Sequence, residues 1–243
     1  MLTKSHIKLI LSLSQKKFRV QNQLFVVEGV KGIREFINSK FDIYQLFSTE
    51  AIFDAETIMV SEQELKKISS LKTPNTALAI FKMPTELPNN QDHLKESSNG
   101  LILALDDVRD PGNLGTIIRL CDWFGIKHLI CSASTVDCYN AKVVQATMGS
   151  LTRVNIQYLD LELFLRAYPN EIFGTFMNGA PIYAETLPEN GVIVMGNEAN
   201  GVSAAIEQLV SKKISIPRFG AIKAAESLNV ATATAIVLSE FKR

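Results

Sequence analysis

The second half of the chain alternates strand-like runs with helix-patterned segments, and this alternation restricts the possible folds more than any other feature. Residues 101–105 form a continuous apolar run, which is typical of a strand buried on both faces of a parallel sheet. Further strand-like runs lie at residues 127–131, 154–158, 172–176, 192–195 and 213–216. Apolar residues recur at helical spacing at residues 114–124, 141–148, 203–210 and 228–241, between these runs or after the last of them. We therefore predict an α/β domain around a parallel sheet.

The first 82 residues show a smaller arrangement of helices and strands. Strand-like runs lie at residues 24–28, 43–47, 57–60 and 76–81, and helical patterns at residues 7–13 and 30–37. Ser61 and Glu64 are spaced as a capping box, which predicts a helix that ends near Ile68. Residues 83–99 are rich in Pro, Asn and Ser, a composition typical of a linker. We predict a small domain at residues 1–82, a linker at 83–99 and a larger domain at 100–243.

The charge distribution indicates where a nucleic acid could bind. The chain carries 25 basic and 25 acidic residues, and a net charge of zero argues against binding through a strong overall positive field. Residues 1–40 contain eight basic and two acidic residues, a net charge of +6, which leaves −6 for the rest. This basic segment is a candidate RNA-binding surface, with Lys16, Lys17 and Arg19 as candidate contacts. A solvated helix face with incidental lysines explains the same charges equally well.

Neither a membrane protein nor a disulfide-stabilised secreted protein is indicated. No apolar run approaches the length of a membrane span, and the first residues lack the pattern of a secretion signal. Cys121, Cys131 and Cys138 form no CxxC pair, and the three histidines stand in unrelated contexts, so we predict no metal site. These features favour a cytoplasmic protein. Trp123 is expected in the core or at a subunit interface.

Three polar segments follow the strand-like runs. They are residues 110–115 (DPGNLG) leading to Arg119, residues 195–201 (MGNEANG), and residues 214–217 (ISIP) followed by 227–230 (SLNV). Structural roles would explain many residues of these segments, because Asn113 and Ser227 are suited to cap helices. Two side chains indicate a chemical function as well. The guanidinium of Arg119 suits a bidentate contact to an RNA phosphate, and Glu198 is a carboxylate that could position a substrate hydroxyl.

Two other classes of nucleotide-binding protein fit the sequence poorly. The glycine spacing of residues 196–201 is similar to that of a P-loop, but Val202-Ser203 stands where a P-loop needs Lys-Ser or Lys-Thr. The chain also lacks the GxGxxG sequence of dinucleotide-binding enzymes. A nucleoside-triphosphate site and an NAD site are therefore disfavoured.

In this order and spacing, the three segments resemble the motifs of the SpoU-type (TrmH-like) RNA ribose 2′-O-methyltransferases of the SPOUT superfamily. The resemblance spans roughly residues 100–243 and implies a trefoil-knotted catalytic domain, S-adenosylmethionine as cofactor, and a homodimer. It implies catalytic positions at Asn113, Arg119, Glu198 and Asn229. It implies cofactor contacts at Thr175, Met195, Gly196, Ile216 and Leu228.

The first domain resembles the small L30e-like substrate-binding domain of rRNA-modifying members of this family. The presence of this domain therefore favours rRNA over tRNA as the substrate. The remaining alternative to an active enzyme is a catalytically inactive RNA-binding protein of the same fold. The sequence departs from the family between Gly220 and Ser227, where residues 221–226 lengthen the usual spacing. The residues expected to hold the cofactor lie on either side of this stretch, so cofactor binding should not depend on it. What the extra residues put in question is the choice of RNA substrate.

Overall fold

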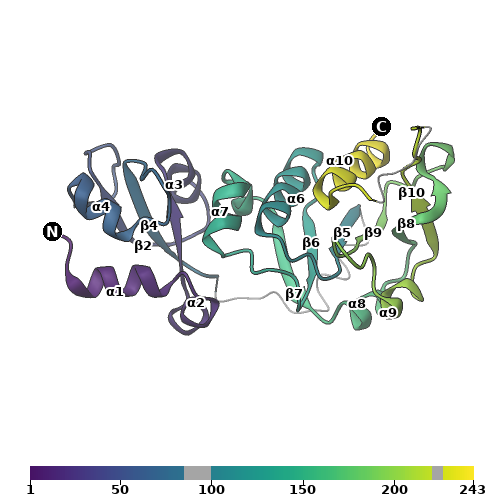
Figure 1. Cartoon of the computed structure of the whole chain (residues 1–243), viewed down its shortest axis with the longest axis horizontal. Helices are drawn as coiled ribbons and strands as arrows, with labels where there is room; N and C mark the ends of the chain where they lie inside the picture. The colour runs from purple at the N-terminus through teal and green to yellow at the C-terminus, as the bar shows by residue number, and fades with distance from the viewer. Residues whose placement is uncertain (85–99, 221–226) are drawn as a thin grey trace. The chain divides into compact units, whose positions relative to one another are not determined.

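The computed structural model describes residues 1–84, 100–220 and 227–243 of the 243-residue chain. The predicted linker lies almost wholly outside the described residues, as do residues 221–226. The described chain separates into two compact units (Figure 1). The first unit contains residues 1–84 and 137–152, and the second contains residues 100–136, 153–220 and 227–243.

The first unit is built on a four-stranded sheet in the order β1-β4-β2-β3. Strand β4 is antiparallel to β1 and β2, whereas β2 and β3 are parallel. The strands are β1 (Leu24–Glu28), β2 (Ile43–Ser48), β3 (Ile58–Met59) and β4 (Ala77–Lys82). The helices are α1 (Lys4–Ser12), α2 (Lys16–Asn22), α3 (Val30–Ile37), α4 (Glu62–Ile68) and α7 (Ala141–Thr147).

Local sequence signals account for the start of two helices in this unit. The predicted capping box is present, because the backbone N–H of Glu64 donates to Ser61 Oγ and that of Ser61 donates to Glu64 Oε2. Gly29, at φ 88°, turns the chain from β1 into α3, a conformation that glycine adopts without steric cost. Helix α3 then buries Ile33 and Phe36 against the sheet.

Residues 137–152 pack in the first unit although they connect two strands of the second. The ring of Tyr139 lies 4.7 Å from that of Phe25 in β1, measured between centroids. Asp137 forms a buried ion pair with Arg19 of α2, with 2.6 Å between Nη2 and Oδ2. The larger domain predicted from the sequence, residues 100–243, includes this segment. Nothing in its local sequence pattern indicates that its contacts lie in the first 84 residues.

The second unit contains a six-stranded sheet in the order β10-β8-β9-β5-β6-β7, and every strand pair is parallel. This confirms the predicted parallel α/β domain. The strands are β5 (Leu101–Leu105), β6 (His128–Ser132), β7 (Asn155–Leu159), β8 (Ile172–Pro181), β9 (Gly191–Met195) and β10 (Lys212–Ser215). The 3-10 turns are η1 (Ser150–Thr152, in the first unit) and η2 (Ile182–Ala184).

Helices cover both faces of this sheet, as the fully buried strand β5 requires. Helices α6 (Pro111–Phe124) and α10 (Val230–Phe241) lie on one face, and α8 (Leu161–Ala167) and α9 (Ala204–Glu207) lie on the other (Figure 1). Side chains of α8 and α9 pack against Ile102 and Val194 of the sheet. None of the described helices has both the length and the apolar character needed to cross a membrane.

Several expected helix ends differ in the structure. Helix α6 begins at Pro111 and is capped by Asp110, whose Oδ1 accepts the N–H of Asn113 at 2.8 Å. This is the favoured arrangement of Asp at the N-cap with Pro in the first turn. Asn113 therefore does not cap the helix, and α10 is capped by Asn229 rather than by Ser227.

Other expectations about this unit also need correction. Helix α9 ends at Glu207, three residues before the predicted end, and α8 was not predicted. Strand β8 runs to Pro181, beyond the predicted end at residue 176. Trp123 is 81% exposed, so its predicted place in the core is wrong, and the subunit-interface alternative remains a prediction.

Candidate active site

The three polar segments lie at the same edge of the parallel sheet. Strand β5 ends at Leu105, five residues before Asp110, whereas Met195 at the end of β9 and Ser215 at the end of β10 lie within their motif segments. Because all the strands are parallel, their carboxyl ends share one edge. Ligands of open α/β sheets bind at this edge.

A chain of side-chain hydrogen bonds joins the three segments. Asn229 Nδ2 donates to Asn113 Oδ1 at 2.8 Å, and Asn113 Nδ2 donates to Glu198 Oε1 at 3.0 Å. These partners are 116 and 85 positions apart in the sequence. The structure thus brings together three of the four predicted catalytic residues.

Chemistry fixes the direction of this hydrogen-bonded chain. Asn229 Oδ1 accepts the backbone N–H groups of Ala231 and Thr232 at 3.0 and 3.2 Å, so its Nδ2 must be the end that points to Asn113. An ionised carboxylate only accepts, so Asn113 must donate to Glu198. Both amides are therefore oriented by their partners, and the chain of donors ends at the carboxylate.

Glu198 is exposed and is held by several donors. Besides the amide of Asn113, the backbone N–H groups of Arg109 and Asp110 lie 3.4 Å from its two carboxylate oxygens. The remaining lone pairs are open to solvent, so this carboxylate can accept a hydrogen bond from a substrate hydroxyl.

The loop that carries Glu198 is folded back on itself. Asn197 and Gly201 exchange backbone hydrogen bonds of 2.9 Å in both directions, and Asn197 Oδ1 accepts the N–H groups of Ala199 and Asn200. A Cβ atom on Gly196 would lie 2.2 Å from backbone atoms of Gly201. Only glycine fits at position 196, and Asn197 shapes the loop that presents Glu198.

Arg119 does not join this cluster within one chain. It is exposed on α6, six residues after Asn113, which places the two side chains about 120° apart around the helix axis. Among the described residues, its guanidinium has no hydrogen-bond or ion-pair partner. A purely structural role for Arg119 would be an ion pair with Asp122, three residues further along α6. The carboxylate of Asp122 instead pairs with Arg153 at 2.9 Å.

Arg109 and Asp107 lie beside the cluster and were missed by the sequence analysis. The Arg109 guanidinium makes two contacts of 2.8 Å with the Asp107 carboxylate, which lower the pKa of Asp107 and raise the pKa of Arg109. Asp107 has φ 62°, and its carbonyl oxygen accepts Asn197 Nδ2 at 2.6 Å. The signal available in the sequence was a pair of aspartates directly after a buried strand.

Of the five predicted cofactor residues, Met195 ends β9, Gly196 and Ile216 directly follow strand ends, Leu228 lies two residues before α10, and Thr175 lies within β8, just after the residues that pair with β9. Met195 and Gly196 are buried, Thr175 and Ile216 are half-buried, and Leu228 is 50% exposed. Thr175 Oγ1 donates to the carbonyl oxygen of Val194 at 3.3 Å. None of the five carries a charge, so their contacts with the cofactor that the resemblance implies would be apolar or through the main chain. Their role as cofactor contacts remains a prediction.

The predicted RNA contacts divide into two kinds. Arg19 is 2% exposed, because Asp137 and the carbonyl oxygens of Leu13 and Ser14 accept hydrogen bonds from its guanidinium. Its prediction as an RNA contact is therefore wrong, and its role is to hold the first unit together. Lys16 and Lys17 are exposed on α2.

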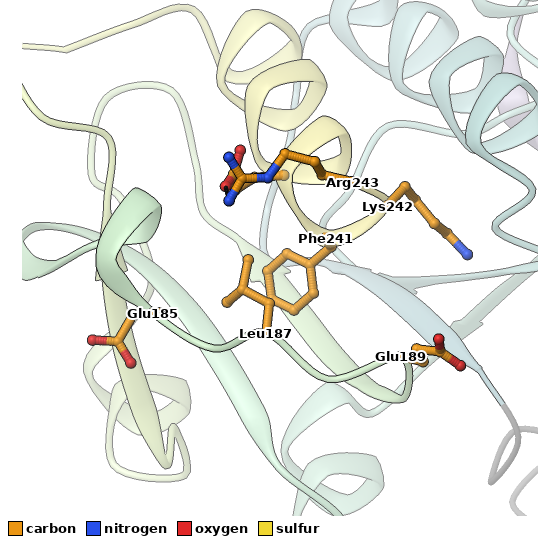
Figure 2. A pocket seen from close by; sticks show the side chains of 7 residues that line it. Glu185, Leu187, Glu189, Phe241, Lys242 and Arg243 are labelled. Atoms are coloured by element: carbon orange, nitrogen blue, oxygen red, sulfur yellow. Dashed lines mark ion pairs between the residues drawn. The ribbon is translucent and has the colours of Figure 1, made fainter.

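None of the motif residues lines the cavity of about 400 Å³ whose lining side chains Figure 2 shows. Its lining consists of Glu185, Leu187, Glu189 and the last four residues of the chain, 240–243. Glu240 and Arg243 pair within it at 2.9 Å. It contains none of the predicted catalytic residues, so we do not assign the reaction to it. Within the described ranges, no cluster of three or more His, Cys, Asp or Glu side chains could hold a metal ion.

Comparison with known proteins identifies the family of both parts of the chain. Residues 100–239 match the model of the SpoU rRNA Methylase family, and residues 4–79 match that of the MRM3-like substrate binding domain. The chain is 30% identical over 237 residues to the 23S rRNA (guanosine(2553)-2′-O)-methyltransferase RlmP of Bacillus subtilis (strain 168). That match covers 93% of this chain and 91% of the relative.

Solved structures agree along nearly the whole chain. A TrmH-family RNA methyltransferase structure from Porphyromonas gingivalis is 36% identical, with a TM-score of 0.88 over 100% of this chain and 98% of the other. The AdoMet-bound rRNA methyltransferase of Sinorhizobium meliloti is 29% identical, with a TM-score of 0.86 over 99% of this chain and 95% of the other. The inferred family and its parallel α/β fold are confirmed, and this chain belongs to the SpoU rRNA methylase family.

Proposed function

We propose that this protein transfers a methyl group from S-adenosylmethionine to a ribose 2′-hydroxyl of ribosomal RNA. The observation that carries the proposal is the hydrogen-bonded chain Asn229–Asn113–Glu198, which unites the three motifs in a member of the SpoU family. Ribosomal RNA is favoured over tRNA because RlmP and the Sinorhizobium meliloti relative are both named as rRNA methyltransferases and align with nearly the whole chain. An inactive RNA-binding member is disfavoured because all four catalytic positions are occupied by the expected residues.

The cofactor would lie against Thr175, Met195, Gly196, Ile216 and Leu228, at the carboxyl edge of the sheet. When bound, S-adenosylmethionine supplies a methyl group on a positively charged sulfur, so the electrophile comes with the cofactor. The protein must then hold the ribose hydroxyl in line with that methyl group and exclude other geometries. The trefoil knot implied by the family is part of this proposal.

Glu198 is the group best placed to orient the attacking hydroxyl. Its carboxylate is the acceptor at the end of the donor chain, and its exposed lone pairs can receive the hydroxyl proton in a hydrogen bond. With the cofactor held at the carboxyl edge of the sheet, the ribose oxygen would take its methyl group, the carbon–sulfur electron pair would remain on the sulfur, and the hydroxyl proton would leave through the hydrogen bond to Glu198 and on to solvent. Asn113 holds the carboxylate in position, and Asn229 holds Asn113.

Arg119 would bind an RNA phosphate and stabilise the developing negative charge on the ribose oxygen. Its use as a base is costly, because a guanidinium stays protonated at pH 7 and its neutralisation costs about 9 kcal/mol. Since Arg119 lies away from Glu198 within one chain, we propose that the enzyme works as a homodimer through its second unit. The highly exposed Trp123, four residues further along the same helix face, supports an interface there.

We also propose that the enzyme acts in the cytoplasm, because its three cysteines are buried thiols and none of them belongs to a disulfide. The test of the whole function is transfer of labelled methyl groups to rRNA from cells that lack the gene, followed by mapping of 2′-O-methyl positions. We expect one position in rRNA to be labelled. Labelling of tRNA alone would show that tRNA, not rRNA, is the substrate. Cofactor binding measured by calorimetry, without methyl transfer to either RNA, would favour a catalytically inactive RNA-binding protein.

A further inference from the structure

Two exposed aromatic rings lie outside the hydrogen-bonded cluster. Tyr183 of η2 is 44% exposed, and Phe219 is 83% exposed. Their ring centroids are 6.4 Å apart and their planes differ by 26°, so the two rings are stacked. Stacking of this kind gives the pair a defined orientation, although most of Phe219 remains open to solvent.

The two rings leave the sheet at the edge that carries the candidate active site. Ser215 of β10 pairs with Pro181 of β8, and each is the last residue of its strand. Tyr183 follows Pro181 by two residues, and Phe219 follows the predicted cofactor contact Ile216 by three. The pair is therefore continuous with the segment expected to hold the cofactor.

We propose that Tyr183 and Phe219 form a stacking platform for an unpaired base of the RNA substrate, next to the nucleotide that is methylated. This inference rests on the proposed function. Proteins that act on single-stranded or unstacked RNA hold its bases on aromatic side chains, since every base presents a flat π face.

A second copy of this chain is a weaker candidate for the occupant. A stable protein interface buries roughly 800 Å² on each partner, far more than two rings present. The area of one ring instead matches the face of one base. Stacking tolerates any base, so the platform contributes affinity and position, and base identity must be read elsewhere.

The first test compares substitutions of Phe219 in steady-state methyl transfer. Phe219→Ala is expected to raise the KM for RNA roughly tenfold, with little change in cofactor affinity. Phe219→Trp should retain a low KM because it keeps a flat ring, whereas Phe219→Leu keeps bulk alone and should resemble Phe219→Ala. Leu163→Ala, at a 65% exposed position of α8, is the matched control and should leave the KM unchanged.

The second test observes stacking directly. The chain contains a single tryptophan, Trp123, so Phe219→Trp adds one new fluorophore in the platform, and the unchanged protein reports the background signal. A short single-stranded RNA should quench the added fluorescence. Each of three results would overturn the platform. They are an unchanged KM in Phe219→Ala, equal activity of the Phe219→Leu and Phe219→Trp variants, and a changed oligomeric state of a Phe219 variant without a change in its RNA affinity. Quenching without any methyl transfer by the unchanged protein would instead retain the platform and reject the proposed reaction.

Discussion

At the scale of single residues, Asn229 shows how one amide can serve both folding and chemistry. Its oxygen accepts the first N–H groups of α10, and its nitrogen donates to Asn113. Serine or aspartate would cap the helix as well as asparagine does, but neither presents an N–H to Asn113. The choice of asparagine is therefore explained by the hydrogen-bonded chain that leads to Glu198.

These two roles can be separated by substitution. Asn229→Asp should keep the cap, with stability within about 0.5 kcal/mol of the unchanged protein, yet lower the methyl-transfer rate at least tenfold because Asn113 loses its donor. Asn229→Ala should lose both, with a stability cost of about 1 kcal/mol. Thermal unfolding and single-turnover rates measure the two effects, and normal activity of the aspartate variant would contradict the role of the donor.

The role of Arg119 can be tested in the same way. Arg119→Ala should abolish methyl transfer and leave cofactor binding nearly intact, because the predicted cofactor contacts lie on other segments. Arg119→Lys keeps the charge but loses the planar, bidentate grip on phosphate, so we expect a severe loss that higher pH does not repair. Single-turnover rates from pH 7 to 10 decide between the roles. A lysine variant that regains activity as the pH rises would indicate a general base.

At the scale of helices, strands and loops, most of the fold could be predicted from the sequence. Buried strands such as β5 are apolar at every position, and α4 carries its capping box in the sequence. Short elements with weak signals were missed, such as α2, which is only seven residues long. The site was harder, because the alignment of Asn113 with Asn229 depends on contacts between distant segments. The exposed direction of Arg119 likewise depends on where helix α6 packs.

The glycine loop offers a prediction at this scale. Gly196→Ala would place a methyl group against the backbone of Gly201 and Val202, so the loop must open and Glu198 must move. We expect loss of methyl transfer and weaker cofactor binding, measured by calorimetry. Gly220→Ala is the matched control, because a Cβ at position 220 meets open space. Normal cofactor affinity and transfer in Gly196→Ala would show that the loop tolerates the change.

At the scale of the whole molecule, the buried pair of Arg19 and Asp137 secures residues 137–152 in the first unit. Side chains of both residues are almost fully buried, at 2% and 10% exposure. Removal of one partner from such a pair leaves an uncompensated charge, which is far more damaging than the loss of an exposed pair.

Arg19→Leu should therefore lower the stability of the first unit by about 3 to 5 kcal/mol, because Asp137 keeps its charge without a partner. Hydrogen exchange of the α7 amides is the direct measurement, and it should accelerate strongly. Lys17→Leu, an exposed cation on the same helix, is the matched control and should leave exchange unchanged. Slow α7 exchange in the Arg19 variant would show that other contacts suffice to hold the segment.

The inclusion of α7 in the first unit also has a consequence for synthesis on the ribosome. The sheet of the first unit is complete when Lys82 has been made, but the partners of Arg19 and Phe25 are made only with Asp137 and Tyr139. At about 5–20 residues per second, those two side chains wait on the order of 3 to 11 s for their contacts. During that interval the nascent first unit has a charged and an aromatic group without their native partners, so its final folding step is coupled to the emergence of the catalytic half.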